Sequence, residues 1–162
     1  MRGYAAIGLW RPKNPANIGG ALRAAYIYDA RLVCIAGERE WKRPIRHPAD
    51  TPQAWRHVPV QRSDDLRSLI PFDCTPIGVD LVDGAIALPE FVHPQRAFYI
   101  FGPEDGTLGD SVLSWCAYRV YVPTKRCMNL AATVNVVLYD RLSKQINNEK
   151  YGRNLKHVLG AA

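Results

Sequence analysis

The chain has 162 residues, of which 48% are apolar and 22% charged, a composition typical of one globular domain. No apolar run approaches the roughly 18 residues that a bilayer span needs, and the N-terminal stretch is too short for a signal peptide, so we expect neither a membrane protein nor a secreted one. The formal net charge of +6 is unevenly spread, with +7 over residues 1–63, −7 over 64–110 and +6 over 111–162. Two basic ends around an acidic middle favour a polyanionic partner such as nucleic acid, and an ordinary solvated surface explains them equally well.

The cysteines and histidines bear on compartment and metal binding. Cys34, Cys74, Cys116 and Cys127 form no C-x-x-C pair, and three of them lie in apolar or strand-like surroundings. This pattern is typical of reduced, buried cysteines, so we expect a cytoplasmic protein. The four histidines lack the spacing of metal ligands, and we expect no metal site.

In the first half of the chain, strand-like apolar runs alternate with a helical pattern. Residues 4–10 predict a first buried strand, 17–29 a helix and 31–36 a second strand. Residues 37–62 are rich in Arg, Trp, Pro and His without a clear period, which predicts a long loop with short elements. A loop of this length in a compact domain is more often functional than idle.

The second half continues the alternation. Three further strands are predicted, over residues 75–81, 97–101 and 118–122. Three helices are predicted, over residues 63–70, 110–116 and 128–146. Alternating strands and helices predict an α/β fold with a mostly parallel sheet flanked by helices. We expect a single domain over 1–162, of which about 147–162 form a polar, basic tail.

The first segment that carries chemistry opens the helix after the first strand, from Asn17 to Arg23. A dinucleotide-binding fingerprint would need glycine at positions 17, 19 and 22, and only Gly19 fits, so this interpretation is weak. What remains is a helix N-terminus whose unpaired N–H groups favour anions. The alternative is that Asn17 is an N-cap and Arg23 a surface residue.

Two more segments follow strands. In 101–109, three glycines let the backbone turn sharply and approach a ligand, and Glu104 is a candidate to pair with a cation such as Arg23 or to bind a substrate hydroxyl. In 121–130, Lys125 and Arg126 supply positive charge, and the amide of Asn129 lies at a helix start. Taken alone, either segment is equally well explained as an ordinary turn or a capped helix.

Together and in this order, the three segments resemble the SpoU (TrmH-type) branch of the SPOUT RNA methyltransferases. The family motifs run N-x-G-x-x-x-R, then F-G-x-E-x-x-G, then I-P-M followed by S-[LM]-N. The matching residues are Asn17, Gly19 and Arg23, then Phe101, Gly102, Glu104 and a downstream glycine, then Val122, Pro123, Met128 and Asn129. The sequence departs from the motifs where Cys127 replaces serine and Thr124 replaces methionine, and its loop between Pro123 and Arg126 is about three residues shorter than in many members.

The resemblance implies a C-terminal deep trefoil knot, a homodimer with composite active sites, and S-adenosylmethionine as methyl donor, giving S-adenosylhomocysteine. By match, the cofactor-binding residues are Val79, Asp80, Leu81, Gly102, Val122, Cys127 and Met128. In a composite site, Arg23 is able to serve the cofactor of the neighbouring subunit.

The implied reaction is methyl transfer to a ribose 2′-hydroxyl of RNA, with Arg23 as the activating group. A guanidinium is effectively always protonated, so our hypothesis is that Arg23 binds the adjacent phosphate and polarises the hydroxyl. Asn17, Glu104 and Asn129 complete the expected catalytic set by holding Arg23 and the substrate in place.

We expect no separate RNA-binding domain, and the segment from Met128 to Asp140 is similar to the small stand-alone tRNA methyltransferases that act at the wobble ribose. Other targets of the same chemistry are rRNA and the D-loop of tRNA. The expected RNA-binding residues are Lys42, Arg43, Arg46, Lys125 and Arg126, although a solvated basic face is as good an explanation. A non-catalytic RNA-binding module is the alternative of another class; Cys127 favours it, and the four retained catalytic positions argue against it.

Overall fold

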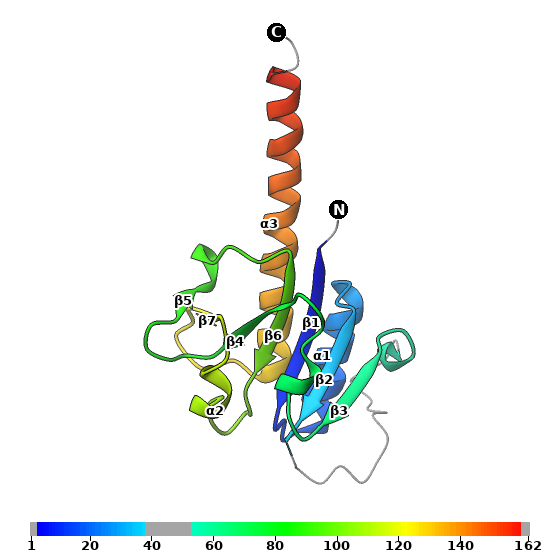
Figure 1. The fold of residues 1–162 in the computed structure, drawn as a ribbon, viewed down its shortest axis with the longest axis vertical. Helices are drawn as coiled ribbons and strands as arrows, with labels where there is room; N and C mark the ends of the chain where they lie inside the picture. The colour runs from blue at the N-terminus through cyan, green and yellow to red at the C-terminus, as the bar shows by residue number, and fades with distance from the viewer. Residues whose placement is uncertain (1–2, 38–52, 160–162) are drawn as a thin grey trace.

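The computed structural model describes residues 3–37 and 53–159, with side chains as far as Asn147. Within these residues, seven parallel strands form one sheet in the order β3-β2-β1-β6-β4-β7-β5 (Figure 1). The strands are β1 (Tyr4–Trp10), β2 (Leu32–Ala36), β3 (Val60–Ser63), β4 (Thr75–Val79), β5 (Ile86–Ala87), β6 (Arg96–Phe101) and β7 (Tyr118–Tyr121). The predicted α/β fold with a parallel sheet is confirmed.

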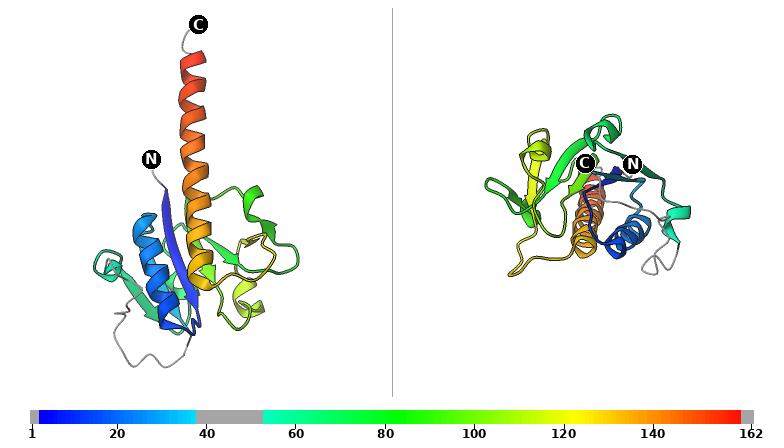
Figure 2. Two further views of the ribbon diagram at one scale, coloured as in Figure 1. Left: turned by 180° about the vertical axis from the view of Figure 1, so that it is seen from behind. Right: turned by 90° about the horizontal axis from the view of Figure 1, so that it is seen from below.

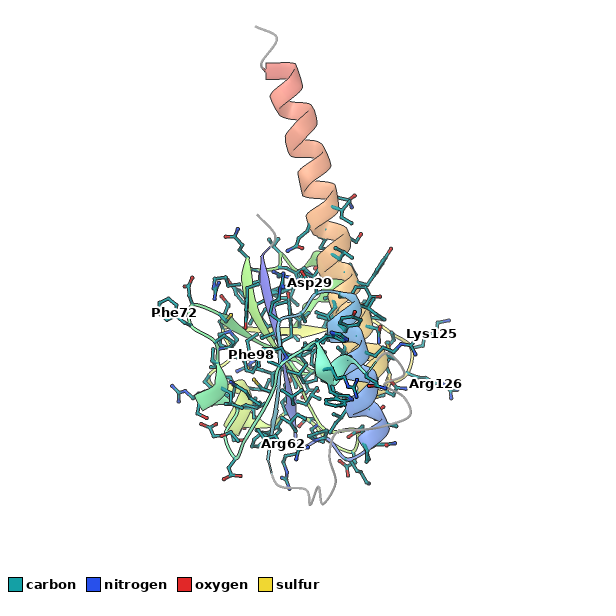
Figure 3. All side chains as sticks on the ribbon, turned by 90° about the vertical axis from the view of Figure 1, so that its right-hand side faces the viewer. Asp29, Arg62, Phe72, Phe98, Lys125 and Arg126 are labelled. Carbon is teal, nitrogen blue, oxygen red and sulfur yellow. The ribbon has the colours of Figure 1, made fainter. Side chains whose placement is uncertain are left out.

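The helices are α1 (Pro15–Ile27), α2 (Asp110–Leu113) and α3 (Leu130–Leu159), with 3₁₀ turns η1 (Ala54–Arg56), η2 (Arg67–Leu69) and η3 (Leu88–Glu90). The central strands are apolar because parallel strands are covered on both faces, and every residue of β2 is buried. Alternate residues therefore serve two cores. Ile7 and Tyr99 pack with α1 and α3, two helices that lie side by side on one face of the sheet (Figure 2). Phe98, labelled in Figure 3, packs on the opposite face with Leu108 and Leu113.

One predicted helix was wrong, and one strand lies at the end of the segment predicted as a loop with short elements. The segment predicted as a helix over 63–70 is the end of β3 followed by the single turn η2, whose N–H groups are bound by the Asp65 carboxylate at 2.9 and 3.2 Å. Ile70 is extended, as is favoured before Pro71, so the turn does not continue as a helix. The segment over 37–62 was predicted as a long loop with short elements because it has no clear period. Residues 38–52 of this segment lie outside the described residues, and its end forms β3, an edge strand held by its pairing with β2.

The last helix is longer than predicted and packs closely on the first. α3 continues past Ile146 to Leu159, where the sequence predicted a tail, and Figure 2 shows it rising beyond the sheet. Its near end lies against α1, where a Cβ on Gly20 would come within 2.7 Å of the Ala131 Cβ. This close approach places the start of α3 beside the start of α1 and the ends of the central strands.

The cysteines agree with the expected reduced state. All four are free; Cys34 and Cys74 are buried, Cys116 is half-buried and Cys127 is exposed. Burial raises the pKa of Cys34 to about 12 and that of Cys116 to about 11, which keeps both as unreactive thiols. Among the described residues, no helix combines the length and apolar character that a bilayer span requires.

Candidate cofactor pocket and catalytic residues

A pocket of about 350 Å³ opens where β4, β6 and β7 end and α3 begins. This is the edge of a parallel sheet at which α/β proteins bind ligands, since the strand ends and the loops after them converge there. The volume lies within the usual range for small-molecule sites. All seven residues expected to bind a cofactor line it, namely Val79, Asp80, Leu81, Gly102, Val122, Cys127 and Met128.

The loop after β6 is fixed by Asp80 at the end of β4. One carboxylate oxygen of Asp80 accepts the Leu108 N–H at 2.7 Å, and the other accepts the Leu81 N–H at 2.8 Å. The loop also needs two of its glycines. A Cβ on Gly102 would lie 3.2 Å from the Leu108 nitrogen, and Gly109 has φ +70°. Asp80 therefore shapes the pocket wall through its side chain.

Glu104 joins this loop to the start of α1. Its Oε1 accepts the side-chain amide of Asn17 at 2.7 Å and the Asn14 N–H at 3.1 Å, and its Oε2 accepts the Lys13 N–H at 2.7 Å. Partial burial raises the pKa of Glu104, but these donors outweigh burial and hold the pKa below its usual value. Glu104 was expected to pair with a cation such as Arg23 or to bind a substrate hydroxyl. Its partners in the structure are one side-chain amide and two backbone N–H groups, and it does not pair with Arg23.

Asn17 reaches Glu104 because it is not the N-cap of α1. The cap is Asn14, whose Oδ1 accepts the Ala16 N–H at 2.9 Å, and Pro15 follows at the first helical position. Asn17 thus lies in the first turn with its amide turned to the neighbouring loop. Lys13 adds an ion pair with Asp105 at 3.2 Å.

Arg23 lies apart from the other three expected catalytic residues. It is exposed on α1, about 9 Å along the helix from Asn17, and does not line the pocket. Within the described part of the chain, its guanidinium forms no hydrogen bond or ion pair. A single chain therefore brings Asn17 and Glu104 together and leaves Arg23 available to a partner or a substrate.

Asn129 caps α3 at the pocket. Its Oδ1 accepts the Ala132 N–H at 2.7 Å, and its neighbours Met128 and Leu130 line the pocket. Thr133 also lines the pocket and donates its hydroxyl to the Asn129 carbonyl at 2.9 Å. Sequence reasoning missed Thr133, although its position four residues after the cap places it on the same helix face.

The expected RNA-binding residues divide into two groups. Lys125 and Arg126 are exposed on the loop before α3, line the pocket and project away from the body of the molecule (Figure 3). A hydrogen bond of 2.8 Å from the Thr124 hydroxyl to the Arg126 carbonyl holds this loop in a turn. Lys42, Arg43 and Arg46 lie outside the described residues.

The family assignment rests on a match over most of the chain. Residues 5–139 match the model of the SpoU rRNA Methylase family. The chain belongs to this family. The three pocket motifs described above, from Asn17 to Asn129, fall within the matched residues. No curated protein sequence matches the chain significantly.

Solved structures show the same fold at low sequence identity. The SpoU methyltransferase AviRb from Streptomyces viridochromogenes, in complex with AdoMet, has a TM-score of 0.75 at 18% identity, covering 90% of this chain and 59% of that one. The TrmH/SpoU tRNA modifying enzyme from A. aeolicus has a TM-score of 0.77 at 13% identity, covering 94% and 78%. A structure described as giving insight into 2-OH methylation of C/U34 on tRNA has a TM-score of 0.73 at 20% identity, covering 91% and 99%. This chain spans about three fifths of the AviRb chain.

Proposed function

We propose that this family member transfers a methyl group from S-adenosylmethionine to a ribose 2′-hydroxyl of RNA, with the wobble position of tRNA as its substrate. The observation that carries the proposal is the hydrogen bond between Asn17 and Glu104. It joins the first motif to the second at a pocket that the second and third motifs build. If Asn17 were only a helix-capping residue and Glu104 only part of a Gly-rich turn, the two segments would not need to be in contact.

The residues at the pocket fit the proposed cofactor. Val79, Leu81, Val122 and Leu130 give apolar walls suited to an adenine ring, and the Thr133 hydroxyl and the two loop cations are suited to the amino-acid end. S-adenosylmethionine supplies an electrophilic methyl group when bound. No group of His, Cys, Asp or Glu among the described residues is placed to hold a metal, so no metal enters the proposal.

Arg23 is the proposed activating residue, acting on the pocket of a partner subunit in a homodimer. Its exposure and its distance from its own pocket support this arrangement. The guanidinium remains charged, so its role is to bind the phosphate beside the acceptor ribose and polarise the 2′-hydroxyl. The hydroxyl proton then leaves to phosphate or water. Asn17, Glu104 and Asn129 position the two loops and the helix around the reacting groups.

The choice of tRNA rests on size and charge. The solved structure concerned with C/U34 of tRNA is covered over 99% of its length, so the two chains are of similar extent. Lys125 and Arg126 place positive charge at the pocket mouth, where a phosphate backbone is attracted. We place the reaction in the cytoplasm, where free cysteines stay reduced.

We also propose that the segments after β6 form the family's trefoil knot. The sheet order supports this, because β7 pairs between β4 and β5, both of which precede it in the chain. The knot would place the loop before α3 inside the turn of the chain that forms the pocket.

The test is incubation with labelled S-adenosylmethionine and, separately, tRNA or rRNA from cells lacking the protein, followed by mapping of the labelled nucleotide. We expect label on a tRNA wobble ribose as a 2′-O-methyl group. Label on rRNA or at another tRNA position would keep the chemistry and change the substrate. Label on a base, on protein or on DNA would overturn the proposal.

A non-catalytic RNA-binding module remains the second candidate, because exposed Cys127 stands where the family has serine and a thiol is a weak hydrogen-bond partner. Calorimetry with S-adenosylmethionine separates the two. Absence of binding even with tRNA present would favour the module.

A further inference from the structure

A partly buried polar cluster joins the middle of α3 to β6 and to the segment before β6. Its side chains are His93, Tyr99, Asp140, Arg141 and Lys144. Arg141 is only 5% exposed, and the His93 side chain is 4% exposed. The cluster lies outside the pocket, and the proposed reaction makes no use of it.

The direction of each hydrogen bond follows from what the end groups can donate. Arg141 has only donors, so its Nη1 donates to the Tyr99 hydroxyl oxygen at 3.2 Å. The Asp140 carboxylate can only accept, so in neutral His93 it is Nε2 that carries the proton and donates to Asp140 Oδ2 at 2.8 Å. Nδ1 is then without a proton and accepts from the Tyr99 hydroxyl at 2.6 Å. Lys144 also donates to Asp140 Oδ2, at 2.7 Å.

Protonation of His93 would disrupt this arrangement of hydrogen-bond donors and acceptors. A second N–H at Nδ1 would face a hydroxyl that already accepts from Arg141, so the Tyr99 proton would lose its acceptor. Burial lowers the pKa of His93, and Lys144 and Arg141 lower it further, against the opposing effect of Asp140. The Phe91 ring forms a T-shaped contact with the imidazole and offers no alternative acceptor.

β6 and α3, which carry four of the five side chains of the cluster, also contribute residues to the pocket. On β6, Tyr99 lies two residues before Phe101, which lines the pocket. On α3, pocket-lining Thr133 shares a helix face with Asp140 and Lys144, and the rise from Thr133 to Asp140 is about 10 Å. A shift or rotation of α3 against β6 therefore moves Thr133 relative to Phe101, the end of β6, which also lines the pocket.

The main chain before β6 is held by the same cluster. Lys144 donates to the carbonyls of Leu88 and Phe91 at 2.6 and 3.0 Å, and Arg141 donates to those of Pro94 and Gln95 at 2.6 and 2.8 Å. His93 lies between these two anchors, so its side chain completes the attachment of α3.

We infer that His93 is a positioning residue which, in its neutral Nε2–H form, keeps α3 in register with β6, so that binding of S-adenosylmethionine weakens when His93 becomes protonated. The part that concerns the cofactor rests on the proposed function. The tautomer and the attachment of α3 stand on the contacts alone.

The first experiment measures S-adenosylmethionine affinity by calorimetry between pH 7.5 and 5.0 for the wild type, His93→Gln and His57→Gln. Glutamine can accept from Tyr99 and donate to Asp140 but does not titrate. We expect affinity to fall about tenfold on acidification in the wild type and in the exposed-site control His57→Gln, and by less than about threefold in His93→Gln. Equal acid sensitivity in all three proteins would overturn the inference.

The second experiment follows the His93 ring nitrogens by NMR and needs no cofactor. We expect the neutral Nε2–H tautomer at pH 7.5 and a higher titration midpoint in Tyr99→Phe, which loses the donor to Nδ1 and keeps the core ring. A protonated Nδ1 at pH 7.5, or an unchanged midpoint in Tyr99→Phe, would contradict the inference. Lack of cofactor binding at every pH in the wild type would instead contradict the proposed function, and the NMR result would still decide the role of His93.

Discussion

The side-chain amide of Asn17 donates to the Glu104 carboxylate at 2.7 Å, across 87 positions of sequence. The contact crosses from the first turn of α1 to the loop that forms one wall of the pocket. Because the same carboxylate also accepts two backbone N–H groups, Glu104 fixes both the orientation of α1 and the shape of the loop.

Replacing the Glu104 carboxylate tests how much it stabilises the contact between α1 and the loop. Glu104→Gln puts an NH₂ group among three donors, so we expect a loss of about 1 kcal/mol in the free energy of unfolding and at least a tenfold loss of methyl transfer. The pKa of Glu104 is lowered in the folded state, so its contribution is present above the usual 4.5 and is lost as pH falls through the folded value. The stability difference should therefore shrink between pH 6 and pH 3. Glu90→Gln, an identical change at an exposed site, should show neither effect.

Mixing two inactive variants tests whether Arg23 serves a partner's pocket. Arg23→Ala should leave the unfolding free energy within about 0.5 kcal/mol of wild type, since Arg23 is exposed, while methyl transfer falls by two orders of magnitude or more. The Arg23→Ala protein is then mixed with Gly102→Val, a variant whose pocket is blocked but whose Arg23 is intact. The mixture should recover about a quarter of wild-type activity, because half of randomly paired C₂ dimers carry one intact composite site. No recovery on subunit exchange would mean that Arg23 acts on its own pocket.

Two glycines of the loop after β6 form a matched pair. Gly102→Ala would bring a Cβ within 3.2 Å of the Leu108 nitrogen and displace the loop, so we expect about a tenfold weaker binding of S-adenosylmethionine. Gly106→Ala meets only an ordinary contact at 3.6 Å from Pro103 and should leave affinity within about twofold. Calorimetry on the two variants separates local crowding from a general stiffening of the loop. Stiffening would weaken S-adenosylmethionine binding equally in both variants.

Cys127→Ser tests the main departure from the family pattern. The hydroxyl is a better hydrogen-bond partner than the thiol, so we expect S-adenosylmethionine to bind about three- to tenfold more tightly. Cys74→Ser, at a buried position away from the pocket, should cost stability without raising affinity. If S-adenosylmethionine binding and methyl transfer are both undetectable in Cys127→Ser, the cysteine is not what prevents the cofactor from binding.

The central part of the fold and the composition of the pocket could be predicted from the amino-acid sequence. Buried parallel strands are apolar throughout, so β1, β2 and β6 are visible as runs, and the motif glycines and polar residues follow strand ends that must converge on one edge of the sheet. Polar edge strand β3 and the turn at η2 escaped this reasoning, because pairing and a following proline decided them.

Which polar groups meet could not be predicted in this way, because it depends on how distant segments pack. Asn14 and not Asn17 caps α1, which leaves the Asn17 amide for Glu104. The partners of His93 come from β6 and from α3, and no local pattern brings them together. Propensity and periodicity act over a few residues, whereas the hydrogen bonds His93–Asp140 and Asn17–Glu104 join residues 47 and 87 positions apart and depend on the packing of their segments.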